Sequence, residues 1–167
     1  NWDLFECTMN HITVETYFRL YAHVFLNAVD KVLHLDVDLL VFDDLLPFWH
    51  TELGDNYMAG VRGNTINGTH LAAAGFDVKK HTYYLAGSNL LNLKKMRESN
   101  ISDLIFNLIS NYSLLMKFQD QDIMNVLFKD YSQTVPLRFN ADTSIFNDAE
   151  VKERLRRDKY SEYIEAI

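Results

Sequence analysis

The sequence predicts an α/β domain in which helices flank a mostly parallel sheet. Short apolar runs of strand length alternate along the chain with longer segments whose apolar residues recur every three or four positions. The chain has 167 residues, the length of one ordinary domain, and 48% of them are hydrophobic, which is enough for a sizeable core. Because no repeat, low-complexity tract or linker interrupts it, we expect residues 1–167 to form a single domain.

The first predicted elements are a helix, a strand and a turn-like segment. Residues 13–28 carry apolar side chains at helical spacing. Residues 31–35 form a short apolar strand, which ends at Asp36 and Asp38. A helical or turn-like piece is expected at 47–53. The two carboxylates therefore lie at the carboxyl end of a strand, where open α/β sheets bind their ligands.

Strands and helices alternate through the rest of the chain. Strands are expected at 57–61, 88–93 and 133–138. Helices are expected at 102–116, 120–128 and, with mixed charges, 150–167. The charged helix has the pattern of a solvated face, and peripheral contact with a membrane surface is the alternative.

The overall charge excludes some classes of partner. A net charge of −7 and an isoelectric point near 5.3 are opposite to the basic surface that binds a nucleic-acid backbone, so no nucleic acid is expected. No apolar run approaches the roughly 18 residues of a membrane-spanning helix, so no transmembrane segment is expected either.

Asp36 and Asp38 are the most informative residues. On an extended strand, positions i and i+2 share one face, which cannot be a core face if both carry carboxylates. Two unpaired carboxylates this close repel by about 4 kcal/mol at an effective dielectric of about 20, and a divalent cation reverses the sign of the interaction. Oxygen ligands favour Mg²⁺, Mn²⁺ or Ca²⁺, which would bridge the pair to phosphate oxygens. His34, on the same face, is a possible third ligand, but packing is the favoured role.

Several motifs, in one order, resemble the retaining glycosyltransferases of family 8, which include bacterial lipopolysaccharide sugar transferases and glycogenin. The longest is YYLAGSNLLNLKKMR at 83–97, which is similar to the family's Y-F-N-A-G-V-L-L-I-N-L-K-K-W-R. The others are TYFRL at 16–20, KVLHLDVD at 31–38, LLPFW at 45–49, DQDIMN at 120–125 and LRFN at 137–140.

The resemblance implies a GT-A fold, a Rossmann-like architecture that binds nucleotide-diphosphate sugars. Its implied metal ligands are Asp36 and Asp38, with Mn²⁺ or Mg²⁺ as the cofactor. Its implied donor-binding residues are Arg19, Asp36, Val37, Asp38, Ala86, Gly87, Asp120 and Gln121. Asp120 and Gln121 would be the catalytic residues, with the Gln121 carbonyl stabilising an oxocarbenium-like centre rather than attacking it.

The chain also departs from the family pattern. Leu85 stands where the family has a sugar-binding Asn before Ala-Gly, and the family's Asp after the next strand is replaced within residues 62–64. Asn64 or Asn89 are possible substitutes, although neither is at the matching position. These changes favour an unusual donor, such as a pentose, or reduced activity. The family's first nucleotide-binding strand and its later H-x-x-G-x-x-K-P-W segment have no counterpart here, so we expect a GT-A domain that is incomplete at both ends and inactive alone.

The predicted function is therefore metal-dependent transfer of a hexose or pentose, with retention, from a UDP-sugar to a glycan or lipid-linked glycan, as in lipopolysaccharide biosynthesis. A bacterial cytoplasmic location at the inner membrane surface is expected, and the Golgi lumen is the alternative. A non-catalytic sugar- or nucleotide-binding relative is the second hypothesis. A phosphatase of the haloacid-dehalogenase type is the third, disfavoured because Leu40 occupies the position of its usual Thr or Ser.

Overall fold

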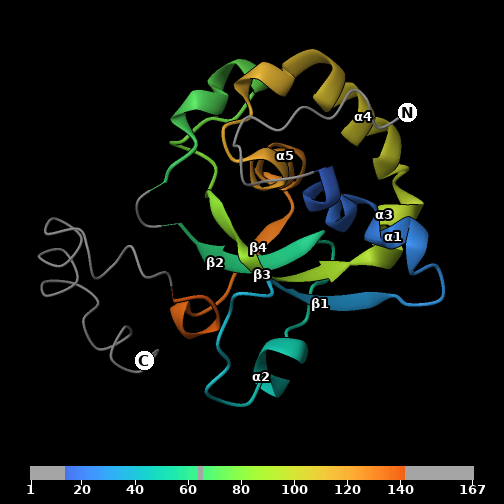
Figure 1. Cartoon of the computed structure of the whole chain (residues 1–167), viewed down its shortest axis with the longest axis vertical. Helices are drawn as coiled ribbons and strands as arrows, with labels where there is room; N and C mark the ends of the chain where they lie inside the picture. Colours follow the sequence, from blue (N-terminus) through green and yellow to red (C-terminus); the bar gives the residue numbers. More distant parts are fainter. Residues whose placement is uncertain (1–13, 64–65, 142–167) are drawn as a thin grey trace, which may run out of the picture.

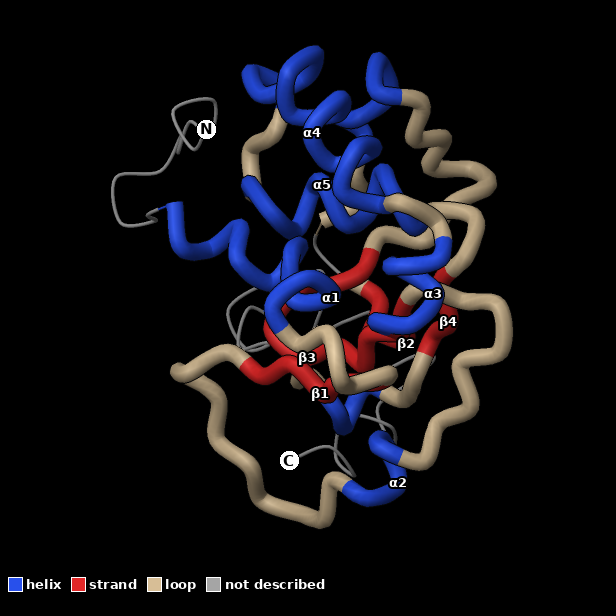
Figure 2. The backbone as a smooth tube through the Cα atoms, turned by 90° about the vertical axis from the view of Figure 1, so that its right-hand side faces the viewer, coloured by secondary structure: helices blue, strands red, loops and turns tan. Residues whose placement is uncertain are grey.

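A four-stranded sheet forms the centre of the protein in the computed structural model, which describes residues 14–63 and 66–141. Its strand order is β1-β3-β2-β4. The strands are β1 (Lys31–Leu35), β2 (Met58–Arg62), β3 (Tyr84–Asn92) and β4 (Ser132–Thr134). Figure 1 shows α3, α4 and α5 on one side of this sheet and α2 on the other, and Figure 2 shows the same layers from the side.

The helices differ in length and type. The α-helices are α1 (Ala22–Phe25), α2 (Leu46–Trp49), α3 (Leu93–Glu98), α4 (Ile101–Tyr112) and α5 (Gln119–Phe128). The 3-10 helices are η2 (Val14–Tyr21), η3 (Thr69–Ala74), η4 (Ser113–Leu115) and η5 (Leu137–Phe139). The helix predicted at 13–28 is thus mainly a 3-10 helix with a single α-turn after it, and its proposed N-cap, Thr13, lies outside the described residues, as does the helix predicted at 150–167.

The sheet is mixed, so the α/β class is confirmed but the expectation of a mostly parallel sheet is wrong. β3 pairs antiparallel with both β1 and β2, and only β2 and β4 pair in parallel. A parallel neighbour requires a crossover, usually through a helix that spans the sheet. In the described part of the connection from β2 to β3, the one helix is the short η3, and the chain returns in the opposite direction. β3 also begins four residues before the predicted strand, at Tyr84.

Neighbouring residues of each strand enter different cores, as the two-residue period of a strand requires. Val32, Leu91 and Met58 lie opposite one another across three strands and pack against the helix side. The residues next to them, Leu33, Leu90 and Ala59, belong to a second, smaller cluster with Phe48, Leu53, Val61, Val135 and Leu137. Both faces of the sheet are therefore covered, and the polar residues Ser88 and Asn89 are fully buried within β3.

Candidate active site

The guanidinium of Arg19 is the centre of the candidate site. Its Nη1 donates to the Ala86 carbonyl at 2.9 Å, its Nη2 donates to Oδ1 of Asp36 at 2.8 Å, and its Nε lies 2.8 Å from Oδ2 of Asp120. The Arg19 side chain is 14% exposed. Because guanidinium nitrogens lie in one rigid plane, these three contacts fix η2, the end of β1, β3 and the start of α5 relative to one another.

Asp120 is buried on the first turn of α5. Besides the contact with Arg19, its Oδ1 accepts a hydrogen bond from Thr16 Oγ1 at 2.7 Å. Burial raises the pKa of Asp120, while Arg19 and then the Thr16 hydroxyl lower it and so partly oppose that rise. The residue before it, Gln119, begins the helix with a φ of +40°, a left-handed conformation that is uncommon for a residue other than glycine.

Gln121 is half-buried and is held at both ends of its amide. Its Oε1 accepts a hydrogen bond from the Ala86 backbone N–H at 2.8 Å, and its Nε2 donates to the Tyr83 hydroxyl at 3.0 Å. Asn125, one turn later on α5, binds the adjacent strand: its Oδ1 accepts from the Tyr84 N–H at 2.7 Å and its Nδ2 donates to the Tyr84 carbonyl at 2.8 Å. These hydrogen bonds hold α5 against the first residues of β3.

Behind Gln121 lies a buried group that the sequence analysis missed. Asp122 is fully buried; its Oδ1 accepts from the Tyr83 hydroxyl at 2.5 Å, and its Oδ2 accepts from the Phe118 N–H at 2.9 Å and lies 2.8 Å from Nε2 of His70. Burial, and then the charge of Asp122, raise the pKa of Tyr83. The signal for Asp122 was its place in the Asp120-Gln121-Asp122 run, whereas nothing near His70 in the sequence pointed to this contact.

Asp36 and Asp38 lie just after β1 rather than on it, so the argument that they share one face of a strand does not hold. The backbone turns at Val37 and Asp38, and both residues are exposed. Asp36 remains anchored, because its N–H donates to the Gly87 carbonyl at 2.8 Å and its carboxylate contacts Arg19. Within 14–63 and 66–141 no group of three or more His, Cys, Asp or Glu side chains is close enough together to hold a metal ion.

His34 packs beside this site. Its Nε2 is 3.9 Å from Oδ1 of Asp36, beyond hydrogen-bond reach. Burial, followed by the nearby Arg19 charge, lowers the pKa of His34 to about 4, although Asp36 acts in the opposite direction. These contacts fit the packing role favoured for His34.

Gly87 and Leu85 shape the strand beside Asp36. A Cβ on Gly87 would lie 3.2 Å from Nδ2 of the buried Asn140 and 3.5 Å from Oδ2 of Asp36, so glycine permits the close approach of these groups. Leu85 is buried, and its carbonyl accepts a hydrogen bond from Asn89 Nδ2 at 2.9 Å. Asn89 lies on the central strand β3 and is fully buried, so it does not present its amide at the surface as a substitute for Leu85. Asn64 lies outside the described residues.

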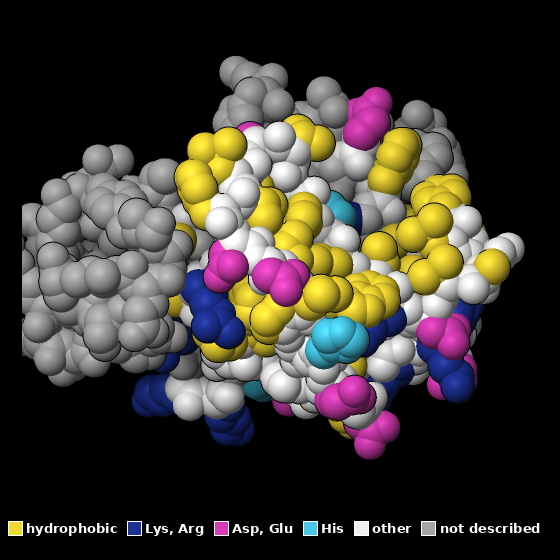
Figure 3. Space-filling view, turned by 90° about the horizontal axis from the view of Figure 1, so that it is seen from below, with side chains coloured by type: hydrophobic (Ala, Val, Ile, Leu, Met, Phe, Trp, Pro, Cys, Tyr) yellow, Lys and Arg dark blue, Asp and Glu magenta, His cyan; other side chains and the backbone are white. Residues whose placement is uncertain are grey.

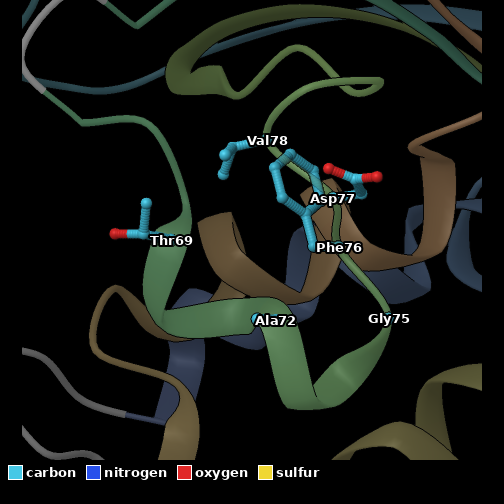
Figure 4. Close-up of a pocket in the computed structure, with 6 residues that line it drawn as sticks. All are labelled: Thr69, Ala72, Gly75, Phe76, Asp77 and Val78. Atoms are coloured by element: carbon cyan, nitrogen blue, oxygen red, sulfur yellow. The ribbon is translucent and has the colours of Figure 1, made fainter.

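Two further surface features are a depression beside η3 and an apolar surface on the side of α2. A depression of about 410 Å³ is lined by Thr69, Ala72, Gly75, Phe76, Asp77 and Val78, and Figure 4 shows it beside η3; none of these residues was a predicted site residue. Figure 3 shows hydrophobic side chains gathered on the lower face of the molecule, the side on which α2 lies. The segment between β1 and α2 contains the exposed residues Val37, Leu40, Val41 and Phe42, and α2 begins with the exposed Leu46.

Comparison with known proteins gives one consistent result. The chain is 31% identical over 137 residues to a "putative glycosyltransferase" of Haemophilus influenzae, covering 81% of this chain and 42% of that protein. It is 26% identical to a lipopolysaccharide 1,2-glucosyltransferase of Escherichia coli, covering 83% and 42%. The crystal structure of the galactosyltransferase LgtC in complex with donor and acceptor sugar analogues matches with a TM-score of 0.78 and 32% identity, over 90% of this chain and 57% of LgtC.

These matches span about two fifths of the two curated relatives and just over half of LgtC. The structural likeness confirms the predicted GT-A fold. No helix in the described part of the chain is both long and apolar enough to cross a membrane. A family model described as "Glycosyl transferase family 8" matches residues 3–165, and the chain therefore belongs to glycosyltransferase family 8.

Proposed function

We propose that the protein containing this chain transfers a sugar from a UDP-sugar donor to a glycan or lipid-linked glycan, with retention of configuration. The observation that carries the proposal is the Arg19 cluster, which joins Asp36, the Ala86 carbonyl and Asp120 beside Gln121. Membership of family 8 and the likeness to LgtC, crystallised with donor and acceptor sugar analogues, support sugar substrates.

Asp120 is the proposed sugar-binding carboxylate. Its Oδ1 accepts from Thr16 Oγ1, whereas its buried Oδ2 lies 2.8 Å from Arg19 Nε without a hydrogen bond among the described residues, so the carboxylate keeps acceptor capacity for a sugar hydroxyl. Arg19 pairs with the carboxylate and so compensates part of the cost of keeping a charge in a buried place. The ion pair also holds Asp120 in one orientation before substrate arrives, which lowers the entropy cost of binding.

Gln121 is the proposed stabiliser of the reacting carbon. An amide is a weak nucleophile, but its carbonyl oxygen carries a partial negative charge that stabilises an oxocarbenium-like centre. The Ala86 N–H uses one lone pair of Oε1 and leaves the other for the substrate. Such a fixed dipole needs no reorganisation during the reaction, which is the condition under which electrostatic stabilisation is most effective.

Asp36 and Asp38 fit a divalent cation by their donor chemistry, since Mn²⁺ and Mg²⁺ prefer carboxylate oxygens. Within the described residues no hydrogen bond or ion pair involves the exposed carboxylate of Asp38, and Arg19 contacts only one oxygen of Asp36. Bound there, the ion would supply charge neutralisation of the departing diphosphate. Two protein carboxylates leave most of an octahedral shell to other oxygens, including those of the phosphates.

We propose that the acceptor is lipid-linked and that transfer takes place at the cytoplasmic face of a bacterial membrane. The exposed apolar segment from Val37 to Leu46 follows Asp36 directly and would suit an acceptor with an apolar part. The similarity to lipopolysaccharide glucosyltransferases points in the same direction.

The test is proton NMR of the first product formed from UDP-sugars and Mn²⁺ by the protein that contains this chain. A retained anomeric configuration is expected, and an inverted one would contradict the proposal. UDP binding without transfer or donor hydrolysis, for every donor tried, would favour the non-catalytic relative instead. Phosphate-ester hydrolysis, measured in parallel, is expected to be absent.

A further inference from the structure

Gln121 is backed by a chain of buried polar groups that the proposed function does not use. It runs from Gln121 Nε2 to the Tyr83 hydroxyl, from that hydroxyl to Asp122 Oδ1, and from Asp122 Oδ2 to His70 Nε2. Tyr83 and Asp122 are buried, and the His70 side chain is 14% exposed. Buried polar groups linked in this way tend to specify a single arrangement, because a broken link leaves a group without a partner.

The partners permit only one direction for these hydrogen bonds. Asp122 receives donors on both oxygens, so it acts as an acceptor and the Tyr83 hydroxyl must donate to it. The raised pKa of Tyr83 agrees with a hydroxyl that keeps its proton. Tyr83 can then only accept from Gln121, which turns the NH₂ end of the amide toward Tyr83 and the carbonyl end toward the Ala86 N–H. The amide orientation is thus dictated at both ends rather than chosen freely.

We propose that Tyr83 is a positioning residue for Gln121, and that Asp122 and His70 in turn hold the Tyr83 hydroxyl in its accepting role. This inference rests on the proposed function, because it assigns the task of presenting Oε1 of Gln121 to the donor sugar. Tyr83 fixes the NH₂ end of the amide, so the free lone pair of Oε1 keeps one direction. The carboxylate of Asp122 also draws the hydroxyl proton of Tyr83, which makes the phenolic oxygen a better acceptor and polarises the Gln121 amide.

Tyr83→Phe is the direct test, and Tyr84→Phe is its matched control. Both tyrosines are buried neighbours, but the Tyr84 hydroxyl contacts Thr134 Oγ1 at 3.1 Å and not Gln121. In the protein that contains this chain, Tyr83→Phe is expected to lower kcat roughly 10- to 100-fold with little change in the KM for the donor, the pattern of an interaction made mainly in the transition state. Tyr84→Phe is expected to keep kcat within about twofold. A similar fall in both variants would overturn the proposal.

A readout without turnover separates this proposal from the proposed function. The side-chain amide signals of Gln121, identified by their loss in Gln121→Glu, report the hydrogen bond to Tyr83 directly by ¹⁵N–¹H NMR. Tyr83→Phe should shift these signals and speed the exchange of their protons with water, while Tyr84→Phe leaves them in place. Unchanged signals in Tyr83→Phe would refute the positioning role even if transfer is observed. Shifted signals in a protein without transfer would support the positioning and count against the function.

If Tyr83→Phe does not fold, a pair of substitutions at His70 carries the same test. His70→Gln retains an N–H that can donate to Asp122, whereas His70→Leu does not. His70→Gln should keep the Gln121 amide signals and kcat close to those of the unmodified protein. His70→Leu should shift the Gln121 amide signals and lower kcat. Equal behaviour of the two variants would overturn the proposal.

Discussion

Nε of Arg19 lies 2.8 Å from Oδ2 of Asp120, and the same guanidinium reaches Asp36 through Nη2. One side chain near the start of the described chain therefore connects the carboxylate after β1 with the carboxylate on α5. A lysine has the charge of arginine but not its planar set of donors, so it cannot make these contacts together. The cluster thus depends on the shape of the guanidinium as well as on its charge.

Arg19→Lys is expected to lower the free energy of unfolding by about 2 to 4 kcal/mol, because at least one of its part-buried contacts with the carboxylates of Asp36 and Asp120 is lost. Urea denaturation measures this change. Arg97→Lys is the control, since Arg97 pairs with the largely exposed Asp30 at 2.7 Å. That variant should stay within about 1 kcal/mol of the unmodified protein. Equal losses at the two positions would mean that the Arg19 contacts do not form as described.

Sequence reasoning located this cluster well because its members lie in local motifs. The strand Lys31–Leu35 was predicted to the residue from its apolar run, and Asp120 and Gln121 fall on the helix expected from its apolar spacing. Arg19 came from the family resemblance, since nothing in its local pattern distinguishes it from a surface arginine.

Local sequence patterns do not predict which distant segments of the chain pair with one another. The reversed direction of β3 depends on how the connection from β2 returns, which the apolar pattern of either strand does not encode. His70 and Asp122 are 52 positions apart, and their contact follows from the docking of η3 on α5. The exposed turn at Val37 and Asp38 was mistaken for extended strand because its residues alternate as strand residues do.

Metal binding provides the second prediction. Mn²⁺ should bind weakly alone and more tightly with UDP, because two carboxylates leave most of the coordination shell to phosphate oxygens and water. Asp36→Asn and Asp38→Asn should each abolish this coupling in titration calorimetry. Asp43→Asn is the control: Asp43 is an exposed acid of the same segment, and its carboxylate accepts from the Asp44 N–H at 2.7 Å. If the coupling between UDP and Mn²⁺ binding persists in both Asp36→Asn and Asp38→Asn, or disappears in Asp43→Asn, then Asp36 and Asp38 are not the metal ligands.

The lowered pKa of His34 predicts a loss of stability in acid. Its folded value is about 4 and its ordinary value 6.5, so between these pH values the unfolded chain binds more protons than the folded one. The contribution of neutral His34 to the free energy of unfolding is fully present above pH 6.5. It is lost as the pH falls toward 4, which lowers the free energy of unfolding by up to about 3 kcal/mol. His34→Phe should flatten this part of the profile, measured by urea denaturation at several pH values. Burial also lowers the pKa of His23, so a smaller slope should remain; an unchanged slope would show that His34 is not the responsible group.

The last prediction concerns Asn125, which joins α5 to β3 through a side chain that acts like a strand backbone. Its Oδ1 faces the Tyr84 N–H, and its Nδ2 donates to the carbonyls of Tyr84 and Gln121, each at 2.8 Å. Asn125→Asp would keep the acceptor but place a carboxylate oxygen against two carbonyl oxygens in a buried position, which should cost about 3 kcal/mol or more of the free energy of unfolding. Asn111→Asp is the matched control, because Asn111 is exposed and its Nδ2 also donates to a helix carbonyl, that of Asn107, at 2.7 Å; it should change stability by about 0.5 kcal/mol or less. Urea denaturation at pH 7 compares the two. If Asn125→Asp proved as mild as the control, the attachment of α5 to Tyr84, and with it the fixed position of Gln121 one turn away, would have to be reconsidered.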